Sequence, residues 1–348
     1  MATMRAAYIT GHGGNEFVAI GERPLPSRAR GEVLVRVRAG GLNRVDLYMR
    51  DSGAGITHRL PQIIGLDGAG TVLEVDDDER RLSVGQAVVL HPGVGCGRCE
   101  FCLRGEHVLC TSMKFFGEHR DGTLADYVCV PAENVFPMPA GLDFVEAASL
   151  AVAHLTAWRM LFTKARVQPW ETVLIFGIGG SVSLAALQLV KMIGGRAIVT
   201  SRDVAKLARA AALGADATID GGKDDIAARA LELTGGRGVD VVIENVGETV
   251  WSAALKSLVR GGRIVTCGAT SGDRPSADLR RLFIRQLQVF GSTHGTFAEF
   301  QDLLTTCERG RFRPVIDSRH RLAGIHAALD RLEAGQQFGK IGIELDPD

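Results

Sequence analysis

Apolar and polar residues follow two different patterns along this chain of 348 residues. Up to about residue 153, apolar and polar positions alternate over short runs at 32–37, 70–75 and 86–90, separated by turns that contain glycine or proline. A period of two is typical of strands with one buried face, so this part predicts a mostly antiparallel β unit. From Thr172 onward, short apolar runs alternate with longer amphipathic stretches, which indicates alternating strands and helices.

The second half of the chain predicts six strands with helices between them. The expected strands are Val173–Phe176, Ala197–Thr200, Ala217–Ile219, Val239–Ile243, Arg263–Thr266 and Leu287–Phe290. The expected helices are Ser183–Met192, Val204–Leu213, Ile226–Leu233 and Thr249–Leu258. Strands joined by crossover helices form a doubly wound parallel sheet, so the predicted fold class is α/β, with a separate β domain before it. Beyond Gly291 the pattern predicts two amphipathic helices and a last strand, at Phe297–Glu308, Leu322–Glu333 and Lys340–Leu345.

Length and charge limit the function classes. A chain of 348 residues predicts two domains, because a single domain usually holds about 100–200 residues. Lysine plus arginine and aspartate plus glutamate both count 40, so no net charge favours nucleic acid or a membrane as partner. The first residues lack the apolar stretch of an export signal, which predicts a cytoplasmic protein. The uncharged window from Thr172 to Val190 is interrupted by glycines, so we expect a buried strand, turn and helix there, and no membrane span.

Four cysteines lie within one short, glycine-containing segment. Cys96, Cys99, Cys102 and Cys110 have the spacing C-x2-C-x2-C-x7-C. Four thiolates form a closed tetrahedral site that leaves no position for water or substrate, so the segment predicts one structural Zn²⁺ per subunit. An iron–sulfur cluster is the alternative, because such clusters are also held by closely spaced cysteines.

A glycine turn follows the first strand of the predicted parallel sheet. It contains Gly177, Gly179 and Gly180, and Ser181 and Val182 continue into the next helix. Glycines let backbone N–H groups approach a pyrophosphate at the positive end of that helix. The strand before the turn and the repeated βα units after it supply the context of a dinucleotide site.

The end of the second predicted strand indicates which nicotinamide cofactor binds. An NAD site places a carboxylate there for the ribose hydroxyls, whereas this chain has Ser201 and Arg202, followed by Lys206. A hydroxyl and a guanidinium can hold a 2′-phosphate, so NADP(H) is predicted over NAD(H). Asp203 leaves NAD(H) open, although an aspartate at this position also serves as a helix cap.

These features together resemble the medium-chain dehydrogenase/reductase superfamily. The resemblance rests on the four-cysteine loop and on the motifs at 175–182, 238–247 and 261–268, which occur in the family's order and cover essentially the whole chain. It implies a GroES-like catalytic domain over 1–154, a Rossmann NADP(H)-binding domain over 155–291, and a segment 292–348 that returns to the catalytic domain.

The resemblance also implies cofactor contacts. Thr156 matches a position that packs on the nicotinamide, and Lys340 matches a tail lysine that reaches the 2′-phosphate, with a solvated surface lysine as the alternative. Further contacts are expected after the fourth, fifth and sixth strands. They are Asn245, Val246, Gly268, Ala269, Ser292 and Thr293.

The chain departs from the zinc alcohol dehydrogenases of this superfamily at the catalytic metal. The three ligand positions of those enzymes fall on Asn43, Leu66 and Val152. Leucine and valine cannot bind a metal, so the resemblance predicts that no catalytic zinc assembles.

The residues that replace this metal site are similar to the quinone oxidoreductase and enoyl reductase branches. Asn43 and Tyr48 are then candidate donors to the substrate, with turn capping and simple packing as their alternatives. His154 is a candidate proton donor or a packing histidine, and Asp46 and Asp67 are expected to hold local loops.

The leading hypothesis is an NADPH-dependent oxidoreductase that transfers hydride to a small activated substrate: an α,β-unsaturated carbonyl, an enoyl thioester or a quinone. One alternative is an alcohol or aldehyde dehydrogenase with a non-standard metal site using His91, His154 or Asp67. Another is an NADPH-binding protein with little turnover. The apolar strand Leu287–Phe290 resembles the family's pairing edge, which implies a homodimer, with a homotetramer as the alternative.

Overall fold

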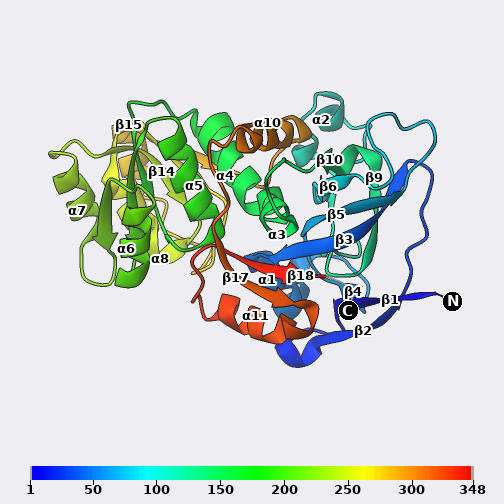
Figure 1. The fold of residues 1–348 in the computed structure, drawn as a ribbon. Helices are drawn as coiled ribbons and strands as arrows, with labels where there is room; N and C mark the ends of the chain where they lie inside the picture. Colours follow the sequence, from blue (N-terminus) through cyan, green and yellow to red (C-terminus); the bar gives the residue numbers. More distant parts are fainter. Residues whose placement is uncertain (1, 346–348) are drawn as a thin grey trace. The chain divides into compact units, whose positions relative to one another are not determined.

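The computed structural model describes residues 2–345 and divides into two compact units. The first unit contains the chain up to Ala153 and the C-terminal segment from Thr296, and the second spans His154–Gly295. In Figure 1 the first unit is drawn mainly from blue to cyan, with its C-terminal segment in orange to red, and the second unit is mainly green and yellow. The C-terminal segment therefore completes the unit that the N-terminal residues begin.

The first unit is built on a seven-stranded sheet, a three-stranded sheet and a two-stranded ribbon. Its strands are β1 (Thr3–Ile9), β2 (Val18–Pro24), β3 (Glu32–Leu42), β4 (Gln62–Ile63), β5 (Asp67–Glu74), β6 (Ala87–Leu90), β7 (Gly93–Val94), β8 (Lys114–Phe115), β9 (Tyr127–Pro131), β10 (Val135–Pro137), β17 (Ile316–Arg321) and β18 (Lys340–Glu344). Its α-helices are α1 (Arg44–Ser52), α2 (Glu100–Leu103), α3 (Phe144–Ala148), α10 (Phe297–Glu308) and α11 (Ile325–Glu333).

Strand β3 is central to the larger sheet. Val33, Val35 and Val37 are buried, and the residues between them are partly exposed, as a period of two requires. β3 pairs antiparallel with β5, β9 and β18, so the predicted mostly antiparallel unit is confirmed. The exception is the parallel pairing of β17 with β18.

The second unit contains one six-stranded sheet in the order β13-β12-β11-β14-β15-β16, paired in parallel throughout. The strands are β11 (Thr172–Ile175), β12 (Arg196–Ser201), β13 (Ala217–Asp220), β14 (Val239–Glu244), β15 (Leu258–Thr266) and β16 (Gln288–Gly291). The helices are α4 (Leu155–Trp158), α5 (Ser181–Met192), α6 (Val204–Ala212), α7 (Ile226–Leu233), α8 (Glu248–Ser257) and α9 (Leu279–Arg285). The predicted α/β fold class is confirmed.

Most boundaries of the second unit lie within two residues of the prediction, with two differences. β15 starts at Leu258, because the chain leaves α8 directly into an extended segment that pairs with Val239. Helix α9 is absent from the prediction, because its apolar residues, such as the exposed Leu279 and Phe283, do not form a buried face. The uncharged window is divided between β11 and α5, and no helix within residues 2–345 is long and apolar enough to cross a membrane.

Candidate functional site

A buried ammonium group lies at the centre of the first unit's candidate site. Lys340 is 1% exposed, and its Nζ donates to Asp67 Oδ2 at 2.7 Å and to Asn43 Oδ1 at 2.6 Å. A third contact runs to the backbone oxygen of Leu42 at 3.4 Å. An ammonium group has three donors, so this lysine is fully engaged within the protein.

Sheet pairing brings these residues together although they are far apart in the sequence. Asp67 begins β5, Asn43 follows β3 and Lys340 begins β18, and β3 pairs with both other strands. Gly41 lies between them, because a Cβ there would come 2.9 Å from Asp67 Oδ2 and 3.0 Å from Lys340 Cδ. Only glycine leaves room for the ion pair at this position.

The amide of Asn43 is oriented by this ion pair. Its oxygen accepts from the ammonium group, and its Nδ2 donates to Asp67 Oδ2 at 3.0 Å. One amide hydrogen remains beyond that bond, and Asn43 is partly exposed. The side chain can therefore donate to an oxygen outside the network while its other groups stay fixed.

Both aspartates of this region hold backbone segments, as expected. Asp46 Oδ2 accepts the N–H of Asn43 at 2.7 Å, and Asp67 Oδ1 accepts the N–H of Val152 at 3.0 Å. Burial raises the pKa of Asp46 to about 7, and it raises that of Glu118 to about 7 as well, with Asp46 as a second cause. Near neutral pH each of these carboxyl groups is therefore partly protonated.

A catalytic zinc does not fit these residues. Leu66 and Val152 carry no ligand atom, and Asn43 and Asp67 already share a buried cation. Asp67 is thereby neutralised by an ammonium group that would repel a metal ion. His91, the other first-unit residue considered for an improvised site, is buried among the rings of His107, Phe297 and Phe300.

The expectation for Lys340 is corrected by its surroundings. A lysine that donates to Asp67, Asn43 and Leu42 is neither a solvated surface residue nor available to a 2′-phosphate. No local pattern predicts this contact, because the partner Asp67 lies 273 residues away in the chain. Tyr48, on α1, is 38% exposed, so its phenol is accessible to a ligand.

The four cysteines come together as predicted. The Sγ atoms of Cys96, Cys99, Cys102 and Cys110 all lie within 4.8 Å of one another. Zinc–sulfur bonds of about 2.3 Å in a tetrahedron separate the sulfurs by about 3.8 Å, so the thiols fit one ion at their centre and lie too close for a multi-iron cluster.

Backbone N–H groups donate to sulfur atoms of this cluster. The N–H groups of Cys96 and Ser112 both donate to Cys110 Sγ, at 3.3 and 3.4 Å. The backbone N–H of Cys102 lowers the pKa of Cys99 to about 6, whereas burial raises that of Cys102 to about 12. A bound dication would convert all four thiols to thiolates.

The residues expected to bind the dinucleotide gather at one edge of the second unit's sheet. Gly177 and Gly179 have φ values of +67° and +115°, which other residues rarely adopt, and Gly180 caps α5 without a side chain. A Cβ on Gly177 would lie 3.1 Å from the Val246 side chain. The start of α5 thus presents backbone N–H groups and its positive end, which fits a pyrophosphate.

Two further side chains hold this edge through hydrogen bonds. Ser183 donates to Phe176 O at 2.7 Å and accepts from Asn245 Nδ2 at 3.0 Å. Glu244 is fully buried and accepts the N–H groups of Val246 and Gly247 at 2.5 and 2.7 Å. The signal that could have identified Glu244 in the sequence is a carboxylate at the end of a predicted strand, followed by Asn-Val-Gly.

The remaining expected contacts follow β15 and β16. Gly268 fits because a Cβ there would lie 2.9 Å from Asn245 O, and Ala269 comes directly after it. Ser292 donates its N–H to Thr266 O at 2.9 Å, and Thr293 is next in the chain. All of these residues lie at the carboxyl ends of parallel strands, where such sheets bind ligands.

The end of β12 has the polar groups expected there. Arg202 is exposed, and Lys206 lies one turn further along, on α6. Asp203 caps α6 by accepting the N–H groups of Ala205 and Lys206 at 2.9 and 3.3 Å, and its own N–H donates to Ser201 Oγ at 3.1 Å. Asp203 is therefore engaged as a helix cap.

Thr156 and His154 belong to the second unit, and both are buried. His154 Nε2 lies 3.4 Å from Gln188 Oε1, on α5, which fits a packing histidine. Neither residue belongs to the compact unit that contains Asn43.

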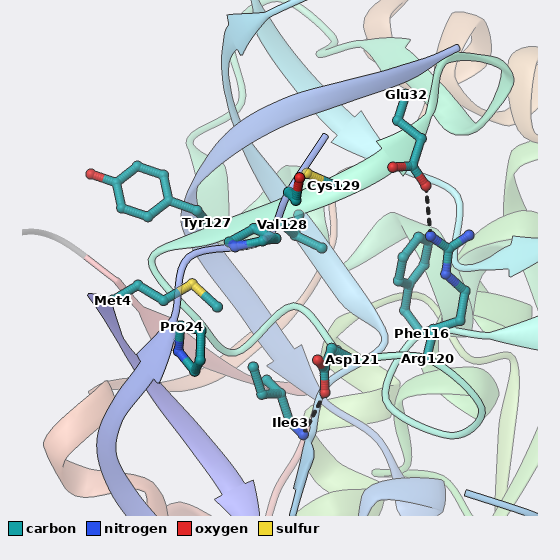
Figure 2. A pocket seen from close by; sticks show the side chains of 13 residues that line it. Met4, Pro24, Glu32, Ile63, Phe116, Arg120, Asp121, Tyr127, Val128 and Cys129 are labelled. Carbon is teal, nitrogen blue, oxygen red and sulfur yellow. Dashed lines mark hydrogen bonds and ion pairs between the residues drawn. The ribbon is translucent and has the colours of Figure 1, made fainter. Parts of the chain in front are cut away.

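Figure 2 shows a cavity of about 370 Å³ in the first unit that involves none of the expected residues. Its Arg120 pairs with Glu32 at 2.8 Å and stacks 5.2 Å from the centre of the Phe116 ring, and Asp121 accepts the N–H of Ile63. These charged groups already have partners within the protein, so the cavity presents no unpaired charge to a ligand.

Comparison with known proteins identifies the family. Residues 29–140 match the alcohol dehydrogenase GroES-like domain, and residues 181–309 match the zinc-binding dehydrogenase family. An alcohol dehydrogenase of Geobacillus stearothermophilus is 32% identical over 350 residues, which cover 99% of this chain and 100% of that protein. The chain belongs to the medium-chain dehydrogenase/reductase superfamily and is an oxidoreductase.

Solved structures agree with this assignment. A structure of an NAD-dependent alcohol dehydrogenase has a TM-score of 0.95 and 37% identity, covering 99% of this chain and 100% of its own. A 2-octenoyl-CoA carboxylase reductase, solved with NADP and 2-octenoyl-CoA, has a TM-score of 0.89 and 26% identity, covering 98% of this chain and 87% of its own.

Proposed function

We propose that this oxidoreductase uses NADPH to reduce an activated carbon–carbon double bond or a quinone, without a catalytic zinc. The observation that carries the proposal is the buried Lys340–Asp67 pair beside Asn43, which takes the place of metal ligands. The enoyl thioester seen with the similar carboxylase reductase supports the substrate class.

The first unit's residues supply the groups that such a reduction needs. NADPH, when bound, supplies the hydride. Asn43 Nδ2 uses its remaining hydrogen to donate a hydrogen bond to the substrate carbonyl oxygen. This oxygen gains negative charge as the hydride is transferred, so the hydrogen bond stabilises the transition state. The Lys340 ammonium group polarises the amide through its bond to Asn43 Oδ1. Tyr48, exposed on α1, is the candidate proton donor.

A substrate panel with an Asn43 variant tests this proposal. NADPH oxidation is followed with enones, enoyl thioesters and quinones, in parallel with alcohol oxidation by NAD⁺ and NADP⁺. Turnover of at least one activated acceptor is expected, and Asn43→Ala is expected to lower its kcat/KM about 10²–10³-fold, because an oxyanion donor is lost. Thermal unfolding of the variant checks that the fold persists.

The other outcomes lead to different conclusions. The similarity to NAD-dependent alcohol dehydrogenases supports a second candidate function, oxidation of alcohols. Alcohol oxidation faster than every reduction in the panel would favour that function. Binding of NADPH with no turnover would favour a binding protein.

The proposed preference for NADPH rests on Arg202, which is exposed beside the end of β12. Arg202→Ser is expected to weaken NADPH binding about 10- to 100-fold, because a charge-assisted hydrogen bond contributes about 1.5–3 kcal/mol. NADH binding should stay the same. Fluorescence titration measures both affinities, and Arg209→Ser, on the following helix α6, is the control. Tighter binding of NADH than of NADPH by the unaltered protein would contradict the proposal.

We also propose one structural Zn²⁺ in the cysteine cluster and a homodimer formed through β16. Leu279, Phe283 and Ile284 on α9 and Val289 on β16 are exposed apolar side chains at this edge of the sheet. Their exposure supports a covered interface, and sedimentation velocity that reports a monomer would contradict it.

A further inference from the structure

Two histidine rings face each other in the first unit. His12 lies in the loop after β1, and His58 lies in the segment that follows α1. Their Nε2 atoms are 3.2 Å apart, and the rings meet edge to face with centroids 5.0 Å apart. Both rings are partly exposed, so solvent and small ions can reach them.

The backbone fixes which nitrogen of each ring carries the hydrogen. His12 Nδ1 lies 3.0 Å from Met49 O, and His58 Nδ1 lies 2.7 Å from Ile56 O. A carbonyl oxygen only accepts, so each Nδ1 must be the donor. In two neutral rings, the unprotonated Nε2 atoms would then face each other with a lone pair on each.

Two opposed lone pairs at this separation require a positive charge between them. Zinc–nitrogen bonds of about 2.0–2.1 Å that enclose a near-tetrahedral angle place the two nitrogens about 3.2–3.4 Å apart. The observed 3.2 Å fits this geometry. We propose that His12 and His58 bind a transition-metal dication such as Zn²⁺ through their Nε2 atoms, with water completing the coordination.

One helix end close to His12 favours a cation at this position. The carbonyl groups of Met49 and Arg50 belong to the last turn of α1, which is the negative end of the helix. His12 Nδ1 donates to Met49 O, and the N–H of Gly13 donates to Arg50 O. The nearby guanidinium group of Arg50 is met by the carboxylates of Asp51 and Glu333 at 2.7 and 3.0 Å, which offset its charge.

Gly53 leaves room for this pair of rings because it has no side chain. It ends α1 with a φ of +69°, and a Cβ there would lie 2.7 Å from His58 Cε1 and 3.1 Å from His12 Nε2. Any other residue would push the two rings apart. The metal would join the loop at residue 12 to the segment 53–61, which are otherwise separate in the chain.

Cobalt titration tests the site in the whole protein with zinc loaded in its cysteines. After brief treatment with a mild chelator, one equivalent of Co²⁺ is expected to bind at micromolar concentration, with visible absorption bands that lack thiolate-to-cobalt charge transfer. His12→Gln, His58→Gln and Gly53→Ala should each abolish this binding. His320→Gln, on β17, is the matched control and should retain it.

Nitrogen NMR of the imidazoles supplies a second measurement. Addition of Zn²⁺ should shift both Nε2 signals while both Nδ1 atoms stay protonated, and it should slow hydrogen exchange in residues 53–61. Failure to bind Co²⁺ or Zn²⁺, with one proton shared between the rings, would overturn the proposal. Binding that survives in the double histidine variant, or cobalt bands from thiolates, would overturn it as well.

Discussion

Lys340→Met is expected to destabilise the first unit by about 3–5 kcal/mol. The substitution keeps most of the side-chain volume but leaves the carboxylate of Asp67, which is 0% exposed, without its cation. Removing one partner of a buried ion pair has a cost of this size because an uncompensated charge remains. Native-state hydrogen exchange at β3, β5 and β18 measures the change in the free energy of unfolding of this unit.

A double variant separates the ion pair from the packing around it. Lys340→Met combined with Asp67→Asn removes both charges and should recover much of the lost stability, because replacing both partners of a buried pair is often nearly neutral. A loss of less than about 1 kcal/mol in the single variant, typical of exposed pairs, would mean that water reaches Lys340.

Cys102→Ser is expected to remove the structural zinc and unfold the segment around it. Three thiolates and a hydroxyl bind Zn²⁺ far more weakly than four thiolates, and zinc binding in small finger domains contributes about 10–16 kcal/mol to folding. Zinc retained after mild chelation should fall from one equivalent to none, and proteolysis should cut within residues 93–115. The proposed NADPH binding, which we expect in the second unit, should persist.

Cys129→Ala is the control for this experiment, because Cys129 is buried and outside the cluster. This variant should keep its zinc. Iron and sulfide in the purified protein would contradict the zinc assignment. Zinc that is lost on mild chelation belongs to weaker sites, such as the proposed histidine pair. A second zinc ion that resists chelation in the His12/His58 double variant would contradict the interpretation that no catalytic zinc binds.

Local patterns predicted the fold and the position of the glycine turn well. The strands of the second unit were visible because each is a short apolar run, and the glycine turn of residues 177–180 follows the first of them. Carboxyl ends of parallel strands share one edge, so Asn245, Gly268 and Ser292 could be placed together from sequence order alone.

The centre of the first unit could not be predicted in the same way. Asn43, Asp67 and Lys340 each have an unremarkable local context, and their contact depends on the pairing of β3 with two distant strands. For Lys340, the resemblance pointed to the cofactor, whereas the sheet register points its ammonium group at Asp67. The opposed rings of His12 and His58 were also invisible, because the two residues are 46 positions apart.

Strand β18 is the last strand to be synthesised, and this affects how the first unit folds during translation. The second half of β3 pairs with β18 at Leu42 and Gly41, and the cation for Asp67 comes from the same strand. A growing chain therefore carries an open strand edge and an unmatched carboxylate until residue 340 leaves the ribosome, while all of the second unit is already available to fold. In this protein the domain that starts first is the one that finishes last.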